Sequence, residues 1–349
     1  MFRGSLFIAT LTLVSACRSS TPAPRSAPTA PTPEAKAEAP EAPAPSAPPT
    51  PEPPPPQQPP IATAPPPAAA GTPAAHVAAA LRVLPASADV LVGLSIPRLG
   101  ASVLGEKFTA MLFAARDNLP AACQTLAATD YGDVTVAFGG GAIVGVSTGK
   151  LTEKRMATCL QAILKAKGGD IASKKIAGRK VYYAVGSAED NGWVAWTKQG
   201  VPLLANSEAG ITAALDPRSP KVDADLVALA NRADHSHAAW FAGRVSASKL
   251  AELGVPPGVV SGDVRFYGWL DHAADLQLDA VVTLATPADA TKLEAQLRQL
   301  LEPVRQLPDA ATMLRGLGIG AHGNDVHVVL ALDAATTAAL LAQLKFTPS

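Results

Sequence analysis

The sequence predicts an α+β fold in which helices pack on antiparallel sheets, arranged as two similar tandem halves that follow a disordered Pro/Ala-rich linker. Strand-like runs follow one another directly instead of alternating with helices, which favours antiparallel pairing. The order helix, strand, helix, strand hairpin and long helix occurs twice, once in residues 76–217 and once in residues 218–349. Corresponding features are offset by roughly 125–150 residues, so we expect a duplication.

Strands are predicted where apolar residues occupy every second position. The turn between Asp271 and Asp275 is short enough to join two of these strands as a hairpin. The predicted strands cover residues 89–96, 134–138, 142–148, 237–244, 264–270 and 276–284.

Two long helices are predicted from apolar residues at the spacing i, i+4, i+7, i+8. The first is headed by Thr152, and the second covers residues 287–302. Thr286 is the N-cap of the second helix, Pro287 takes the first helical position, and Asp289 completes a capping box. Shorter helices are expected around residues 76–84, 99–116, 222–233 and 246–253.

Residues 18–73 are dominated by proline, alanine, serine and glutamate. Large apolar side chains are nearly absent, so this segment cannot bury enough surface to offset its ordering entropy. High proline content favours extended polyproline II at about 3.1 Å per residue, a reach of roughly 170 Å. We therefore predict a disordered tether over residues 17–75, including the cysteine at its start.

The first sixteen residues read as a signal peptide, with basic Arg3 followed by the apolar run Leu6–Val14. Val14-Ser15-Ala16-Cys17 resembles the lipobox of bacterial lipoproteins. This resemblance implies diacylation of the Cys17 sulfur, cleavage before Cys17 and acylation of the new amino terminus. It also implies the outer membrane as the destination, because Arg18 and not aspartate follows the cysteine.

The charges of the remaining body balance. Once the four basic and four acidic residues before His76 are subtracted from 29 of each, 25 basic and 25 acidic residues remain. No basic stripe in the sequence indicates nucleic acid or an anionic membrane as a partner. No further apolar run reaches the length of a membrane span.

Cys123 and Cys159 remain once Cys17 is lipidated. An even pair in an oxidising envelope compartment predicts a disulfide between them. Two buried free thiols are the alternative. Neither cysteine has a histidine next to it in the sequence that would indicate a catalytic thiolate.

Gly145-Val146-Ser147-Thr148-Gly149 matches the G-x-S-x-G of serine hydrolases. A nucleophile elbow needs a sharp turn from strand to helix at the serine, but strand-like alternation continues through Ser147 and the helix begins only after Leu151. We interpret the motif as a stripe of small residues on one strand face, suited to close approach by a helix or ring.

Two nucleotide-binding patterns are incomplete. Gly149-Lys150 lacks the other residues of a phosphate loop, since Val144 stands at the required glycine and Leu151 at the required hydroxyl. Gly318–Gly323 matches G-x-G-x-x-G, but Asn324 and a second alternating run follow it, so a hairpin turn is predicted.

Histidines occur at polar turns, and a zinc site would require three or four ligands to converge. His235 and His237 could share one strand face, whereas His322 and His327 lie at another turn. Nothing in the sequence shows convergence, so no metal is assigned and solvated histidines are the alternative.

The four tryptophans, at 193, 196, 240 and 269, fall in strand-like segments. The spacing of Trp193 and Trp196 predicts that they face opposite sides of one strand, with one ring exposed. Packing in the core explains most of them, but an exposed ring could contact a glycan or lipid.

We therefore predict a lipid-anchored envelope protein with a non-catalytic body that binds a protein, glycan or lipid partner, without a cofactor. A serine hydrolase that uses Ser147 is one alternative. A lipid carrier, with sheet faces and helices around a cavity, is another. The sequence leaves open whether the two halves are one domain or two, and the oligomeric state.

Overall fold

The computed structural model describes residues 62–63, 75–100, 120–124, 126, 128–166, 168–186, 192–252, 260–272, 275–305 and 314–343. All of them belong to one compact unit, Pro60–Ser349. The predicted signal peptide, Cys17 and almost all of the predicted linker lie outside the described residues. Residues 101–116 of the helix expected at 99–116 lie outside them as well.

The described strands form one twelve-stranded sheet, and every neighbouring pair is antiparallel, in the order β11-β12-β10-β9-β8-β1-β2-β3-β7-β6-β5-β4. The α+β class and the antiparallel pairing are confirmed. The expected sheets are one continuous sheet, because β1 of residues 76–217 pairs directly with β8 of residues 218–349. The strands are β1 (Val90–Ser95), β2 (Asp133–Gly139), β3 (Ala142–Ser147), β4 (Asp170–Ile176), β5 (Arg179–Val185), β6 (Trp193–Trp196), β7 (Pro202–Ala205), β8 (Ala239–Val245), β9 (Val264–His272), β10 (Leu276–Thr283), β11 (Leu317–His322) and β12 (Asp325–Leu332).

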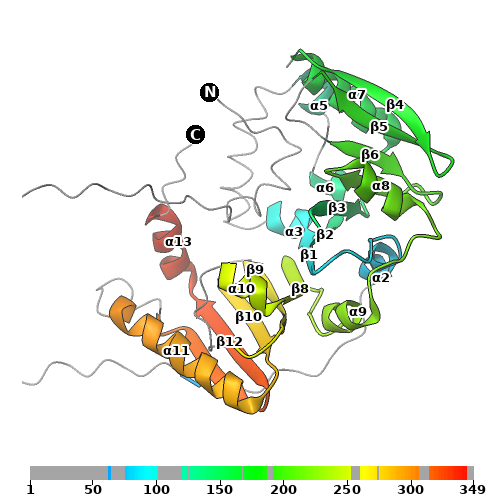
Figure 1. Ribbon diagram of the computed structural model, residues 1–349. Coiled ribbons are helices and arrows are strands. Elements are labelled where there is room, and N and C mark those ends of the chain that lie inside the picture. Colours follow the sequence, from blue (N-terminus) through cyan, green and yellow to red (C-terminus); the bar gives the residue numbers. More distant parts are fainter. Residues whose placement is uncertain are drawn as a thin grey trace, which may run out of the picture. The chain divides into compact units, whose positions relative to one another are not determined.

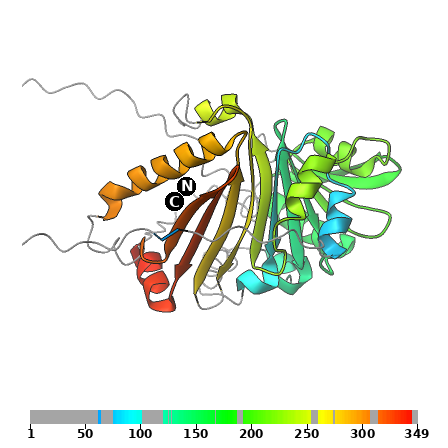
Figure 2. The same cartoon turned by 90° about the horizontal axis from the view of Figure 1, so that it is seen from below.

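Helices lie against both faces of this sheet (Figure 2). None of the described helices combines the length and the apolarity that crossing a bilayer requires. The helices are α2 (Ala75–Leu81), α3 (Ile96–Gly100), α5 (Ala121–Gln124), α6 (Ala128–Tyr131), α7 (Glu153–Ala166), α8 (Glu208–Leu215), α9 (Ala224–Ala230), α10 (Ala247–Glu252), α11 (Pro287–Arg305) and α13 (Ala334–Gln343).

The larger apolar core lies on the face that α2, α8 and α9 cover. Residues of alternating strand positions, such as Val144 and Leu203, point to this face and are fully buried with Ile211 of α8 and Leu226 of α9. The opposite face carries a second core, in which α11 packs on β9, β11 and β12 through Ile319 and neighbouring apolar residues. The period-2 pattern of the strands therefore places separate apolar sets on the two faces.

The structure contains the helix N-cap and the two hairpin turns that the sequence predicts. The Asp289 N–H donates to Thr286 Oγ1 at 3.2 Å, so the predicted N-cap of α11 is confirmed. The hairpin after Asp271 is confirmed by the pair of His272 with Leu276. The Gly323-Asn324 turn is confirmed by pairing of the residues on either side of it, and Gly323 has a φ of 60° that suits glycine.

Strand order runs outward from the central β1–β8 pair in a matching way (Figure 1). One side continues β1-β2-β3-β7-β6 and the other β8-β9-β10-β12-β11. The first side then adds β5 and β4. On each side the long helix, α7 or α11, follows the third strand along the chain.

The two outermost strands differ in their surroundings. Ala62, from the end of the predicted linker, forms a parallel bridge with Gly318 of β11, and its carbonyl accepts a hydrogen bond from the Ile319 N–H at 2.9 Å. At the other end of the sheet, β4 pairs with β5 alone among the described strands.

Candidate functional site

Ser147, the candidate nucleophile, is the last residue of β3 and only 1% exposed. Its hydroxyl donates to the Tyr131 carbonyl at 2.5 Å and accepts from the Gly149 N–H at 3.4 Å. The strand pairing continues through the motif, because Ser147 pairs with Val134 of β2. Helix α7 starts six residues later, at Glu153. The hydroxyl is therefore a structural link between β3 and the end of α6, and the local geometry differs from a strand-turn-helix elbow.

Of the two glycines that flank Ser147, Gly149 serves close packing, as predicted, and Gly145 does not. A Cβ at Gly149 would lie 1.9 Å from the Asp130 carbonyl oxygen, so the α6 backbone occupies the space that a side chain would need. A Cβ at Gly145 would be in ordinary contact with Leu204 of β7. Gly149 therefore allows α6 to approach the end of β3.

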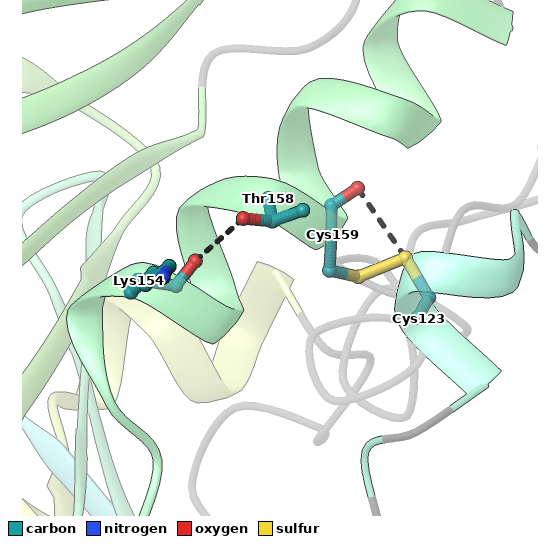
Figure 3. Close-up of a disulfide and its surroundings, with 4 residues drawn as sticks. All are labelled: Cys123, Lys154, Thr158 and Cys159. Atoms are coloured by element: carbon teal, nitrogen blue, oxygen red, sulfur yellow. Dashed lines mark hydrogen bonds between the residues drawn. A yellow bond between two sulfur atoms is a disulfide. The ribbon is translucent and has the colours of Figure 1, made fainter.

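A disulfide joins Cys123 of α5 to Cys159 of α7 (Figure 3). Both residues are buried, at 3% and 2% exposure. The Cys123 sulfur also lies 3.3 Å from the Cys159 carbonyl oxygen. The bond fastens short α5 to the middle of α7, and a thiolate nucleophile is not formed while it is present.

A small polar pocket lies where β1 and β2 meet β8. His76, Asp133, His235, His237 and Trp240 are among its lining residues. Its volume of about 10 Å³ corresponds to roughly one water molecule. The pocket is therefore too small for a substrate or an acyl chain, which typically need hundreds of Å³.

His235 and His237 do meet at this pocket, but they come from the loop before β8 and not from one strand face. His237 stacks on Trp269 with ring centroids 3.6 Å apart, and its Nδ1 lies 3.0 Å from Asp271 Oδ2. His235 Nε2 lies 2.8 Å from the Ala230 carbonyl oxygen. Both imidazoles thus have partners within the fold.

Burial and hydrogen bonding shift the pKa values of two of these groups. Burial lowers the pKa of His235, against a smaller opposing effect of the Ala230 carbonyl. Burial acts to raise the pKa of Asp271, but hydrogen bonds from His237 and the His272 N–H together outweigh it, so that its pKa is lowered. At neutral pH we therefore expect a neutral His235 and an ionised Asp271.

The second pair of candidate histidines lies elsewhere in the sheet. His327 of β12 is 2% exposed, and its Nε2 lies 2.8 Å from Asp279 Oδ1 of β10. His322 is at the end of β11. Within the part of the chain that the structure describes, no three His, Cys, Asp or Glu side chains are arranged to hold a metal ion.

Trp193 and Trp196 face opposite sides of β6, as their spacing predicts, but neither ring is fully exposed. Trp196 is 5% exposed, and its indole N–H donates to the Leu151 carbonyl at 3.1 Å. Trp193 lies on the opposite face of β6, is only partly buried and stacks on Tyr183 at 4.7 Å. The Lys174 ammonium lies 4.8 Å from the Trp193 ring centroid, so this ring already has a cation as a neighbour.

Sequence reasoning missed a group of basic residues at one end of the first half. We call this group the basic hairpin end; it consists of Lys174, Lys175, Arg179, Lys180 and Lys198. The first four lie within three residues of the β4–β5 turn, whose residues Ala177 and Gly178 have φ values of 49° and 72°. Such φ values form the tight turn of a two-residue hairpin.

Arg179 connects the two turns of this group, because it donates to the Trp196 and Thr197 carbonyls at 3.1 and 2.9 Å. Lys198 follows directly in the β6–β7 turn. The signal in the sequence is four basic residues within 174–180, which the overall charge balance conceals.

No protein-family model, curated protein or solved structure matches this chain.

Proposed function

We propose that this chain is a lipid-anchored protein of the cell envelope, attached to the outer membrane through Cys17, whose body binds a partner without catalysing a reaction. The observation that carries the non-catalytic part is the enclosure of Ser147: the residue is only 1% exposed, and its hydroxyl donates to the Tyr131 carbonyl. A nucleophile must reach its substrate and must have a base within hydrogen-bond distance. The partners of Ser147 are backbone groups instead.

A fluorophosphonate probe tests this part of the proposal. We expect no labelling of the full chain that depends on Ser147. Thr148→Ala is the matched control, since it removes the adjacent hydroxyl, which is bonded to the Asp133 backbone. Labelling that is lost in Ser147→Ala and retained in Thr148→Ala would favour the alternative hypothesis of a serine hydrolase.

The anchor is tested separately by metabolic incorporation of a labelled fatty acid. We expect incorporation into wild type and into Ser20→Ala, which changes a residue outside the lipobox-like segment. Cys17→Ala should incorporate none and should lose its stable membrane attachment. Incorporation that persists in Cys17→Ala would refute the anchor at this residue.

Partner binding is tested by incubating full-length protein with envelope protein extract, isolated glycan and lipid vesicles. The proposal expects saturable binding to one of these three classes. Failure to bind any of them would leave the non-catalytic body without a role and would overturn the proposal.

We also propose that residues 76–217 and 218–349 are tandem halves of one duplicated unit. Support comes from the matching strand order on either side of the β1–β8 pair and from α7 and α11, which follow the third strand of each side. A protease site inserted between Pro217 and Pro220 tests whether each half is a folding unit. We expect the cleaved halves to stay associated and to reassemble after separation in denaturant; failure to reassemble would count against two units.

A further inference from the structure

We propose that the basic hairpin end binds the anionic headgroup surface of a phospholipid bilayer. This inference deepens the proposed function and rests on it, because the lipid anchor would hold the body beside such a surface. The proposed partner is a plane of phosphate charges that several lysines can approach together.

The first observation is a pair of like charges within the hairpin. Lys175 of β4 and Lys180 of β5 are directly opposite each other in the strand register. Like charges at directly opposed positions destabilise a sheet. The Lys180 ammonium lies over the Tyr182 ring at 4.6 Å, while no described side chain forms an ion pair with Lys175. An anionic surface at this end would give both ammonium groups an opposite charge.

Protection of the open sheet edge explains only part of this pattern. Lysines on an edge strand discourage pairing with other chains, and β4 is an outermost strand, so Lys174 and Lys175 fit that role. Lys180 is on β5, which has a neighbour on both sides, and Lys198 is in the β6–β7 turn. These two residues need another explanation.

The placement of the lysines around the turn favours a flat partner surface over a linear peptide or glycan. Lys174 points to the face that α8 covers, whereas Lys175 and Lys180 share the opposite face. The turn between them consists of small exposed Ala177 and Gly178. A peptide or glycan strand lying on one face would reach only part of this set. A flat surface met end-on by the hairpin can be reached by lysines of both faces.

Basic residues are also in excess over residues 76–217, which contain the basic hairpin end, and acidic residues over residues 218–349. Residues 76–217 hold 14 Lys and Arg against 11 Asp and Glu, and residues 218–349 hold 11 against 14. Two carboxylates lie near the basic hairpin end: Glu208 pairs with Lys174 at 2.6 Å, and Glu153 accepts from the Tyr182 hydroxyl at 2.7 Å. Five basic residues against these two leave a local excess of positive charge.

The predicted tether is long enough for this orientation. Ala62 lies beside β11, at the opposite edge of the sheet from β4. Eleven strand spacings of about 4.8 Å separate these edges by roughly 50 Å. Linker residues 18–61, at about 3.1 Å each when extended, reach roughly 140 Å. Anchoring at Cys17 therefore allows the hairpin to meet the same membrane.

Vesicle flotation of the full chain carrying Cys17→Ala tests the proposal, because this background removes any contribution from acylation. The probes are vesicles of phosphatidylcholine alone and vesicles with about one third phosphatidylglycerol. We expect binding to the anionic vesicles that weakens when salt rises from about 50 to about 300 mM. Lys175→Gln/Lys180→Gln should weaken that binding by roughly 25-fold, from about five-fold for each lysine.

Lys249→Gln/Lys292→Gln is the matched control, since it removes the same charge from exposed positions in the second half. We expect this pair to bind anionic vesicles like its parent, and inorganic phosphate at equal ionic strength not to displace the protein. Equal binding to both vesicle types, an equal loss in the control pair, displacement by free phosphate, or binding to isolated glycan with none to vesicles would each overturn the proposal. Because all arms lack Cys17, failure here is distinct from failure of the fatty-acid experiment.

Discussion

Outward from the β1–β8 pair, the two sides of the sheet carry the same order for five strands, and then they diverge. The first side continues into the β5–β4 hairpin, where four of the five residues of the basic hairpin end are located. The second side ends at β11, where Ala62 forms a backbone bridge. The shared strands carry most of the strand residues of the two apolar cores, whereas the hairpin adds Val181 to the larger core and charge at an edge. The hairpin thus joins the shared core through β5 and presents its charged residues at the turn end.

The long helices of the two sides are also fastened differently. Helix α7 is tied to α5 by the Cys123–Cys159 disulfide. Helix α11 is tied to β11 by polar contacts, because Glu294 accepts from the Ala321 N–H at 3.1 Å and Arg298 donates to the Ile319 carbonyl. The long helix that follows the third strand is therefore fastened by a disulfide on one side of the β1–β8 pair and by hydrogen bonds on the other.

The largest expected effect comes from the junction that the two sides share. The Trp240 indole covers Gly93 so closely that a Cβ there would lie 1.8 Å from Nε1. Trp240→Ala should lower the free energy of unfolding by about 3–5 kcal/mol, because it empties a buried site between β8 and β1. Denaturant unfolding measures this, with Trp193→Ala as the partly exposed control.

Gly93→Val tests the contact between Gly93 and the Trp240 indole directly. Alone it should clash with the indole, and in combination with Trp240→Ala it should cost less than the sum of the two single changes. If Trp240→Ala costs no more than Trp193→Ala, the junction is not the common centre of the two sides.

The next largest effect is expected from removing the disulfide that holds α7. Removing the disulfide with Cys123→Ala/Cys159→Ala should lower the free energy of unfolding by about 3.5–4 kcal/mol, because the bond closes a 36-residue interval. Wild type in reductant should behave like the variant, and reductant should not affect the variant. Equal masses of the wild-type protein before and after reduction would show that the bond is absent.

A smaller loss is expected for the polar fastening of α11. Glu294→Ala removes the acceptor of the Ala321 N–H and the partner of Arg298, so we expect a loss of about 1.5–3 kcal/mol in the free energy of unfolding. Gln299→Ala, at an exposed position of the same helix, should change stability by less than about 0.5 kcal/mol. Equal effects of the two substitutions would mean that Glu294 does not contribute to holding α11 on β11.

Local patterns predicted much of the fold. Alternation located β1, β2, β3, β9 and β10, and the Thr286 cap fixed the start of α11 because short-range geometry decides both. The joining of β1 to β8 was not predictable, since it depends on contacts between residues about 150 positions apart. Nothing in the alternation of a strand states which other strand lies beside it.

Some parts of the candidate site were predictable from the sequence, and others depended on the strand order. Strand parity correctly placed Ser147 on a stripe of small residues, because alternation passes through the motif. The meeting of His235 and His237 with His76 and Asp133 required the strand order as well as the sequence. The basic hairpin end was missed because basic and acidic residues are equally numerous over residues 76–349. In addition, only the fold brings Lys198 beside the residues of the β4–β5 turn.

The smallest expected effect concerns protonation at the junction. His235, from the second side, faces His76 from the first, with Asp133, Asp234 and His237 also around the pocket. Burial lowers the pKa of His235 in the folded chain, so its unfolded state takes up a proton first as the pH falls. The stabilising contribution is therefore complete above the unfolded pKa of about 6.5 and is lost as the pH falls through the lower folded value. Urea midpoints at about pH 7.5 and about pH 5 should fall more in wild type than in His235→Gln, whose amide can still donate to the Ala230 carbonyl. His322→Gln, at the distant β11 turn, should keep the wild-type response, and an unchanged response in His235→Gln would show that protons at this junction do not affect how the two sides hold together.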